Sequence, residues 1–311
     1  MNIVALFNAL PGGCAQGLIW GIMAVGVFIT YKILDLADLT VDGTMCTGGA
    51  VCVVMMMNGH SVGFSLFCAF IAGMLAGLVT GIFHTTMGIP AILAGILTQL
   101  GLYSINLRIM GNKANVALIT DKYDVLVSMR YLKNVVFYKN TLFVVAVIIA
   151  VLIVILYWFF GTELGCSIRS TGSNENMSRA QGINTDLTKI IGLMLSNGIV
   201  ALSSGLLAQY QGFADINMGR GAIVIGLAAV IIGEVLCDAF FRKGCNFSVR
   251  LGFVLLGGIV YYLVMVLILW LKLDPNDLKL FTAVIVAAFL AVPYLKGQAK
   301  SSFHRLKKGG K

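Results

Sequence analysis

Residues 43–107 read GTMCTGGAVCVVMMMNGHSVGFSLFCAFIAGMLAGLVTGIFHTTMGIPAILAGILTQLGLYSINL and contain no Asp, Glu, Lys or Arg. A helix that crosses a membrane needs about 20 mainly apolar residues, so this block is long enough for several spans. Residues 1–31 are also free of charged side chains, and the first charged residue is Lys32. We read this apolar start as a first span, because it lacks the basic n-region of a secretory signal peptide and continues into hydrophobic sequence. The two blocks predict a polytopic membrane protein.

The composition of the whole chain agrees with this prediction. Hydrophobic residues make up 59% of the chain and charged residues 11%, whereas soluble domains average about 45–50% and about 25%. We therefore expect an all-α transmembrane bundle. The net charge of +9 does not indicate a nucleic-acid partner, because the basic residues cluster at span ends and in the tail, where membrane lipid and the positive-inside rule account for them.

Hydrophobic length predicts about nine spans, with eight or ten left open. We place them at residues 10–31, 44–58, 62–84, 89–107, 141–160, 188–210, 222–240, 251–272 and 280–295. The second and fourth segments are short for a bilayer, so half-helices or a re-entrant hairpin are alternatives for these two. We expect a single transmembrane domain over residues 1–295 and a basic cytoplasmic tail over residues 296–311.

Lys and Arg in the connections predict the orientation, because short cytoplasmic loops carry an excess of both. With nine spans, the tail and the connections that hold Arg169, Arg179, Arg242, Lys243 and Arg250 all fall on the cytoplasmic side, and the N-terminus lies outside. The connection over residues 108–140 opposes this scheme, since it carries six basic residues and falls on the outer face.

The sequence also resembles itself at an offset of 177 positions. The matched pairs are Gly21 with Gly198, Ile22 with Ile199, Ala24 with Ala201, Ala37 with Ala214, Asp38 with Asp215, Leu39 with Ile216 and Gly49 with Gly226. In the expected topology the two copies run in opposite directions, which predicts an inverted repeat with broken helices. Chance similarity between two Gly- and Ala-rich stretches is the alternative.

Few residue patterns indicate chemistry. The chain has no GxxxxGK[ST] motif for nucleotide phosphates, and we find no nucleophile with a plausible base, so we do not expect an enzyme. The seven cysteines are scattered, without a CxxC pair or a Cys/His cluster, which predicts neither a disulfide nor a metal site.

The polar connection over residues 161–189 is the most informative segment. Its core, residues 165–184, reads GCSIRSTGSNENMSRAQGIN. A polar, glycine-punctuated connection of this length can fold into a compact cytoplasmic knob that seats in a groove of a soluble partner. A solvated loop that only joins two spans is the alternative.

The residue order within this connection predicts a short helix. Ser173 is expected as its N-cap and Gly182 as its C′ residue, with Thr185 as the next cap. Glu175 near the start and Arg179 near the end both suit the helix dipole.

Several motifs carry a resemblance to a known family. They are Ile168-Arg169, Gly172, Asn174, Ser178-Arg179-Ala180 and Gly182-Ile183-Asn184 in the connection, and Leu195-Ser196-Asn197-Gly198 in the next span. With these motifs the connection resembles the coupling segment of ABC permeases of the branched-chain amino acid and ribose import superfamily. Residues 35–43, DLADLTVDG, are similar to that family's helix break before its second span. Residues 96–111, ILTQLGLYSINLRIMG, are similar to permeases associated with tryptophan- and tyrosine-type binding lipoproteins.

The resemblance covers nearly the whole chain and implies how it works. It implies a bacterial plasma-membrane importer with two permease copies as a homodimer, ABC ATPase subunits that bind ATP and Mg²⁺, and an extracytoplasmic binding lipoprotein. This chain itself would bind no cofactor. An amino acid, with an aromatic one as the best guess, would be the substrate. The ATPase-coupling residues would be Arg169, Gly172, Ser173, Asn174, Glu175, Ser178, Arg179, Gly182 and Asn184.

Acidic residues at membrane depth are costly and therefore candidates for function. We expect the translocation pathway to be lined or gated at the two helix breaks and at a polar residue within a span, namely by Asp38, Asp42, Asn197, Asp215 and Asn217. Interfacial loop positions for the acids and a packing hydrogen bond for Asn197 are the alternatives. A secondary transporter driven by an H⁺ or Na⁺ gradient, with one of these acids as the ion site, is the rival function, and a membrane assembly or receptor subunit is a third.

Overall fold

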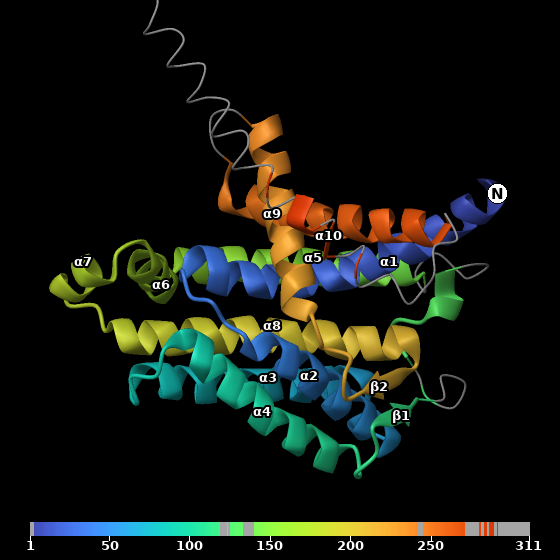
Figure 1. Cartoon of the computed structure of the whole chain (residues 1–311), viewed down its shortest axis with the longest axis horizontal. Coiled ribbons are helices and arrows are strands. Elements are labelled where there is room, and N and C mark those ends of the chain that lie inside the picture. Colours follow the sequence, from blue (N-terminus) through green and yellow to red (C-terminus); the bar gives the residue numbers. More distant parts are fainter. Residues whose placement is uncertain are drawn as a thin grey trace, which may run out of the picture.

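The computed structural model describes residues 3–118, 123, 125–132, 140–241 and 245–270, together with residues 280, 283–284, 286–288 and 291. It is a helical bundle, as the sequence predicts (Figure 1). The helices are α1 (Ile3–Phe28) with a π-helical continuation η1 (Ile29–Ile33), α2 (Thr40–Met57), α3 (Val62–Thr85), α4 (Ala91–Ile109), α5 (Thr141–Gly161), α6 (Glu163–Ser173), α7 (Glu175–Ala180), α8 (Thr185–Gln211), α9 (Ala222–Phe240) and α10 (Phe247–Trp270).

Eight helices within these described ranges are long and apolar enough to cross a membrane. They match the first eight predicted spans. α2 and α4 are continuous helices of 18 and 19 residues, so the alternative of half-helices or a hairpin is wrong for both. The predicted ninth span at 280–295 and the tail at 296–311 lie largely outside the described residues.

The short elements lie at opposite ends of the long helices. Figure 1 shows α6 and α7 together at one end, while a small pair of strands lies at the other. These strands are β1 (Asn115–Ala117) and β2 (Phe213–Asp215), which pair antiparallel with Val116 opposite Ala214. The pair closes the connection between α8 and α9 and is a minor departure from the all-α prediction.

The core is centred on α1 and α8. In the apolar part of each span, 78% of the residues are buried for α1 and 72% for both α8 and the neighbouring α2, whereas only 22% are buried for α5. Glycine on α3 allows close packing against α8, because a Cβ at Gly73 or Gly77 would overlap the backbone carbonyl of Asn197 or Leu193. Small residues of this kind let membrane helices approach each other closely. α1, α8 and their partners therefore form the framework, and α5 lies at its edge.

Two hydrogen bonds across the α1–α8 interface support the internal repeat. The Ser196 hydroxyl donates to the Gly26 carbonyl at 2.8 Å, and the Ser203 hydroxyl donates to the Ile19 carbonyl at 2.7 Å. At an offset of 177 positions, residue 19 corresponds to 196 and residue 26 to 203, so each bond is the counterpart of the other. The order of helix, break and helix also recurs, in α1–α2 and in α8–α9. Two inverted copies related by an approximate two-fold axis should make such a reciprocal pair of hydrogen bonds.

One prediction about the cysteines is wrong. Cys237 at the end of α9 is joined by a disulfide to Cys245. Sequence spacing did not indicate the pair, because Cys237 lies in the last turn of α9 and Cys245 just before α10, and only the placement of these two helices brings them together.

Candidate functional site

The connection between α5 and α8 folds into two short helices, each with a side-chain cap. The Thr162 hydroxyl accepts from the Gly165 N–H and begins α6, and Asn174 accepts from the Met177 N–H and begins α7. The predicted N-cap, Ser173, is instead the last residue of α6. The predicted N-cap is one position too early, because Asn174, rather than Ser173, has the extended backbone that an N-cap needs.

α7 ends as predicted, and α8 begins one residue earlier. Gly182 follows α7 with a φ of +84°, the left-handed conformation that favours glycine. The side chain of Asn184 accepts from the Leu187 N–H and caps α8, so Thr185 is the first helical residue and not the cap. We call residues 162–189 the coupling knob.

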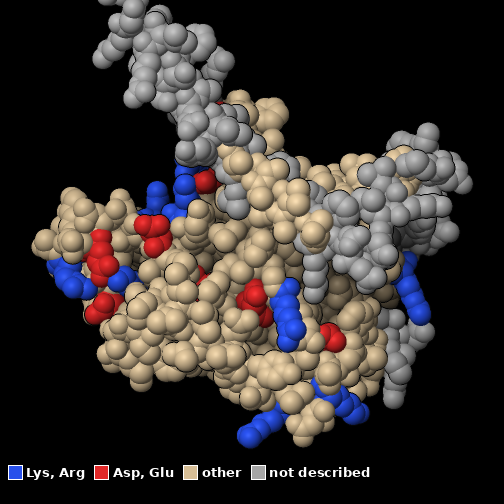
Figure 2. All heavy atoms as spheres, in the orientation of Figure 1, with Lys and Arg blue, Asp and Glu red and all other residues tan. Residues whose placement is uncertain are grey.

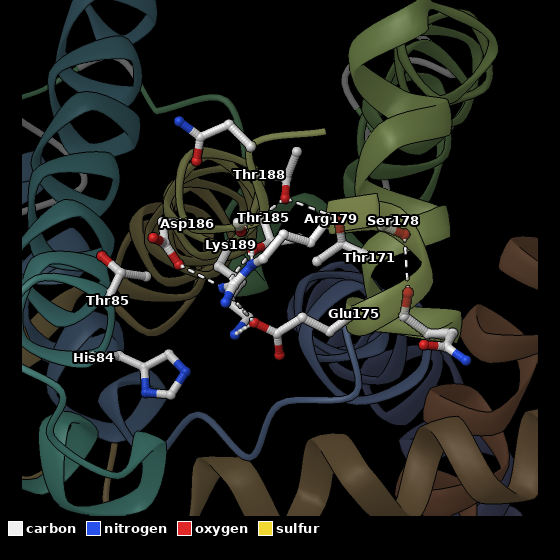
Figure 3. Close-up of polar contacts among 12 residues, drawn as sticks. His84, Thr85, Thr171, Glu175, Ser178, Arg179, Thr185, Asp186, Thr188 and Lys189 are labelled. Atoms are coloured by element: carbon white, nitrogen blue, oxygen red, sulfur yellow. Dashed lines mark hydrogen bonds and ion pairs between the residues drawn. The ribbon is translucent and has the colours of Figure 1, made fainter. Parts of the chain in front are cut away.

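Ion pairs hold α7 against the start of α8 (Figure 3). The Glu175 carboxylate accepts from Lys189 Nζ at 2.7 Å and from Arg179 Nη2 at 3.2 Å. Arg179 Nη2 also donates to the Thr185 hydroxyl at 2.9 Å and lies 3.6 Å from Asp186 Oδ1. The hydrogen bond from Lys189 is the main reason that the pKa of Glu175 lies below its usual value. These side chains fix the angle between the two helices.

Paired hydroxyls tie α6 into the same unit. Thr171 Oγ1 lies 2.9 Å from Thr188 Oγ1 on α8, and Ser170 Oγ lies 2.8 Å from Ser178 Oγ on α7. Apart from Ser178, these are residues that the sequence did not single out. In the sequence, these hydroxyl residues lie about one helical turn from the caps. Which hydroxyl pairs with which can be seen only once the three helices are placed relative to one another.

Gly172 joins the coupling knob to the first span. A Cβ at this position would overlap the carbonyl oxygen of Ile33 and lie 2.8 Å from the Leu34 Cα. Ile33 is the last residue of η1, the π-helical end of the first span. The α6 backbone can approach η1 this closely only because residue 172 has no side chain.

The structure separates Arg169 from the other predicted coupling residues. Its guanidinium lies 6.0 Å from the centre of the Phe247 ring at the start of α10. It forms no ion pair with any residue that the structure describes, in contrast to Arg179. Arg169 therefore belongs to a different surface of α6 from the one that meets α7 and α8.

The tip of the coupling knob is apolar as well as charged. Met177 on α7 is 59% exposed and Leu187 on α8 is 48% exposed. Figure 2 shows positively and negatively charged side chains gathered at this end of the molecule, with more scattered charged side chains over the rest of the visible face. Exposed large apolar side chains beside charged ones are typical of a surface that binds another protein.

Two of the predicted pathway residues are brought together inside the protein. Asn197 Nδ2 donates to Asp38 Oδ2 at 2.7 Å, and Asn197 Oδ1 accepts from the Thr44 hydroxyl at 2.7 Å. Thr40 continues this polar network through its hydroxyl to Thr80 on α3. Asp38 and Asn197 are buried among α2, α3 and α8. In this conformation they hold helices together and do not face an open passage.

The other three pathway candidates lie around the start of α9. Asp42 on α2 accepts from the backbone N–H groups of Gly221 and Ile223 at 3.1 and 3.0 Å, so it caps α9 from a distant part of the chain. Asp215 accepts from the Asn217 N–H at 2.7 Å, and the Asn217 side chain is exposed. These candidates are therefore near the strand pair and separate from the Asp38–Asn197 pair.

No group of three or more His, Cys, Asp or Glu residues among the described ones could hold a metal ion. The coupling knob is held together by its helix caps, its ion pairs and the contact of Gly172 with η1.

Known proteins match almost the whole chain. The family described as "Branched-chain amino acid transport system / permease component" matches residues 10–293. A tyrosine transport system permease protein of Clostridioides difficile (strain R20291) is 39% identical over 291 residues, which cover 94% of this chain and 93% of that protein. The autoinducer 2 import system permease protein LsrC of Yersinia pestis is 30% identical over 186 residues, which cover 58% of this chain and 48% of that protein.

A solved structure shares the fold. PsaBC from Streptococcus pneumoniae, in complex with Fab, superposes with a TM-score of 0.57 at 13% identity, covering 94% of this chain and 95% of that one. Taken with the family match and the 39% identical relative, the helical bundle and its knob lead to one assignment. The chain belongs to the family of branched-chain amino acid transport system permease components, and it is a multi-pass membrane protein that serves as the permease of an ABC-type import system.

Proposed function

We propose that this permease imports an aromatic amino acid and that a separate ATPase drives it through the coupling knob. The substrate part rests on the relative from Clostridioides difficile, which is described as a tyrosine transport system permease. Family membership favours this over the rival function of an ion-driven secondary transporter. The observation that carries the mechanism is the way the coupling knob is braced against two spans at once.

One brace leads to α8. Glu175 is held by Lys189, and Thr171 is held by Thr188, so α6 and α7 are both fixed to the first turn of α8. A force applied to the exposed Met177 and Arg179 would therefore reach α8 directly, without bending a loop.

The other brace leads to α1. Gly172 contacts the end of η1, and the break at residues 34–39 follows immediately. ATP-driven closure of the partner ATPases would press on the coupling knob, shift η1 relative to α8 and change the angle between α1 and α2. This is a shear and hinge movement of packed helices.

The proposed topology puts the coupling knob in the cytoplasm. Two permease copies would then assemble as a homodimer with two ATPase subunits at the knobs. An extracytoplasmic binding lipoprotein would deliver substrate at the opposite end, where β1 and β2 lie. ATP and Mg²⁺ would be bound by the ATPase, and this chain would carry no cofactor of its own.

Reconstitution tests the proposal. The permease, co-expressed with a candidate ABC ATPase and binding protein from the same organism, would be placed in vesicles and assayed for uptake of tyrosine, tryptophan, leucine and ribose. We expect uptake of an aromatic amino acid that requires ATP inside the same compartment as the ATPase. Uptake driven by an H⁺ or Na⁺ gradient without ATP would overturn the energy source, and uptake of leucine or ribose alone would overturn the substrate.

A second measurement tests the orientation. A cysteine introduced at Ser173 would be treated with a membrane-impermeant thiol reagent in intact cells and in opened cells, with the chain lacking this cysteine as the background control. We expect labelling only after the cells are opened. Labelling in intact cells would place the coupling knob outside and remove the basis for ATPase docking.

A further inference from the structure

A groove of about 480 Å³ lies where α5 ends and α6 begins. Its walls include Val154, Tyr157 and Trp158 on α5, Arg169 on α6 and Phe247 on α10. It is separate from the network that braces the coupling knob. Its composition combines an apolar wall, two amphipathic aromatic side chains and a single cation.

The apolar wall belongs to the span that is least covered by the rest of the chain. Only 22% of α5 is buried, and Val154 and Trp158 are 67% and 72% exposed. Trp and Tyr side chains near the end of a span are typical of the boundary between hydrocarbon and headgroups. The groove therefore runs from the acyl-chain region at Val154, past Tyr157 and Trp158 at headgroup level, to Arg169 beyond the end of α5.

The polar end of the groove holds the guanidinium of Arg169. Among the residues that the structure describes, Arg169 forms no ion pair and no acidic side chain lines the groove. The guanidinium lies over the Phe247 ring, 6.0 Å from its centre, and its N–H groups donate to no residue within the described part of the chain. Guanidinium groups bind phosphate in a bidentate manner and are well suited to a phosphodiester.

A neighbouring groove provides the contrast. It is lined by two cations, Lys32 and Arg250, and by two carboxylates, Glu234 and Asp238, and Lys32 Nζ lies 3.1 Å from Glu234 Oε1. An anionic headgroup would meet two carboxylates there. The two grooves thus differ in charge balance although both lie where α10 begins.

We propose that the groove at Arg169 is a binding site for an anionic phospholipid, whose phosphate pairs with Arg169 and whose acyl chain lies along Val154 and Tyr157. The occupant must be anionic at one end and apolar at the other, and a lipid of the surrounding bilayer meets both needs. Since α6 also carries Gly172, bound lipid would steady the base of the coupling knob. This inference rests on the chain being a membrane protein and holds whichever solute is transported.

Native mass spectrometry of the purified full-length permease tests the site. The protein would be titrated with phosphatidylglycerol and with phosphatidylethanolamine of identical acyl chains. We expect phosphatidylglycerol to bind about fivefold more tightly, the effect of one basic residue near a membrane surface. Arg169→Gln should reduce this preference to about one, whereas Arg169→Lys should keep most of it. The matched control is Arg250→Gln in the neighbouring groove, which should leave the preference unchanged.

Other outcomes would overturn the site. They are equal binding of both lipids to the unaltered protein, an undiminished preference in Arg169→Gln, or an equal loss in Arg250→Gln. Displacement of the lipid by millimolar inorganic phosphate would show that the groove selects a free anion instead. If Arg169→Gln does not elute as a folded species, Trp158→Ala replaces it, and this variant should weaken both lipids together while the preference for the anionic one remains. Unchanged binding in Trp158→Ala would also count against the groove.

Discussion

Asp38 and Asp215 make the same local contact at equivalent places in the two broken helices. Each carboxylate accepts a hydrogen bond from the backbone N–H two residues further on, from Thr40 at 2.9 Å and from Asn217 at 2.7 Å. The second carboxylate oxygens differ, because that of Asp38 is bound to buried Asn197, while that of Asp215 meets exposed Asn115. The two copies have therefore kept a turn and diverged in what surrounds it.

This divergence predicts unequal effects of two asparagine substitutions. Asn197→Ala removes one donor from the buried Asp38 and an acceptor from Thr44, so it should lower the free energy of unfolding by about 1–3 kcal/mol. Asn217→Ala is the matched control and should change stability little, since Asp215 is held by the backbone of residue 217. Thermal unfolding in detergent would compare the two. Equal losses would contradict the assignment of Asn197 as a structural brace.

Gly172 should be the most sensitive glycine of the coupling knob. In Gly172→Ala the added methyl group meets the Ile33 carbonyl, so α6 must move away from η1. We expect substrate-stimulated ATP hydrolysis by the assembled complex to fall at least tenfold while basal hydrolysis by the ATPase persists. Gly101→Ala on α4 has open space around its Cβ and serves as the control. Normal stimulation in Gly172→Ala would show that this contact does not transmit the signal.

Asp42 should stabilise α9 although it lies far away in sequence. In Asp42→Ala the N–H groups of Gly221 and Ile223 lose their acceptor, which should cost about 0.5–2 kcal/mol of stability, as for other helix caps. Asp238→Ala, at the opposite end of the same helix, removes an exposed carboxylate and should leave stability unchanged or slightly higher. Chemical unfolding followed by tryptophan fluorescence measures both. A larger loss of stability in Asp238→Ala than in Asp42→Ala would contradict the role of Asp42 as the cap of α9.

The coupling knob should loosen in acid. Lys189 holds the pKa of Glu175 below its usual value, so the folded form binds the proton less readily than the unfolded one. The stabilisation is therefore fully present above the usual pKa of a glutamate and is lost as the pH falls through the lower, folded value. Hydrogen exchange of α7, compared at each pH between the unaltered protein and Glu175→Gln, would detect it. The two proteins should differ at neutral pH and converge in acid, and a constant difference would refute the linkage.

Hydrophobic length alone was enough to locate the spans. Eight of them lie within a few residues of their predicted bounds, because a membrane span needs an unbroken apolar run that can be counted directly. The disulfide between Cys237 and Cys245 and the β1–β2 pair were not predictable in this way. The disulfide depends on how α10 is placed after α9, and the strand pair depends on which two connections meet at one end of the bundle. No local sequence pattern records either.

In the candidate site, too, local sequence rules predict some features, and others depend on how the helices pack. Gly182, Glu175 and Arg179 could be placed from helix-ending and charge rules, and those placements are confirmed locally. The Thr171–Thr188 pair could not, since it joins two helices whose angle is set by packing. A sequence motif groups Arg169 with Gly172, but the two residues contact different parts of the chain. Arg169 lies over Phe247 on α10, whereas Gly172 contacts Ile33 at the end of η1.

α8 is one uninterrupted helix of 27 residues, from Thr185 in the coupling knob to Gln211 beside β2. At about 1.5 Å per residue it measures about 40 Å. Unlike α1, which contains Pro11 and a π-helical end, it contains no proline. Under the proposed mechanism a rod of this kind would act as a lever, so a small tilt at its end in the coupling knob would displace its end beside β2 at the same moment. The rate of the movement at the far end of α8 would then be set by the partner ATPase. It would not depend on a series of successive rearrangements within the permease.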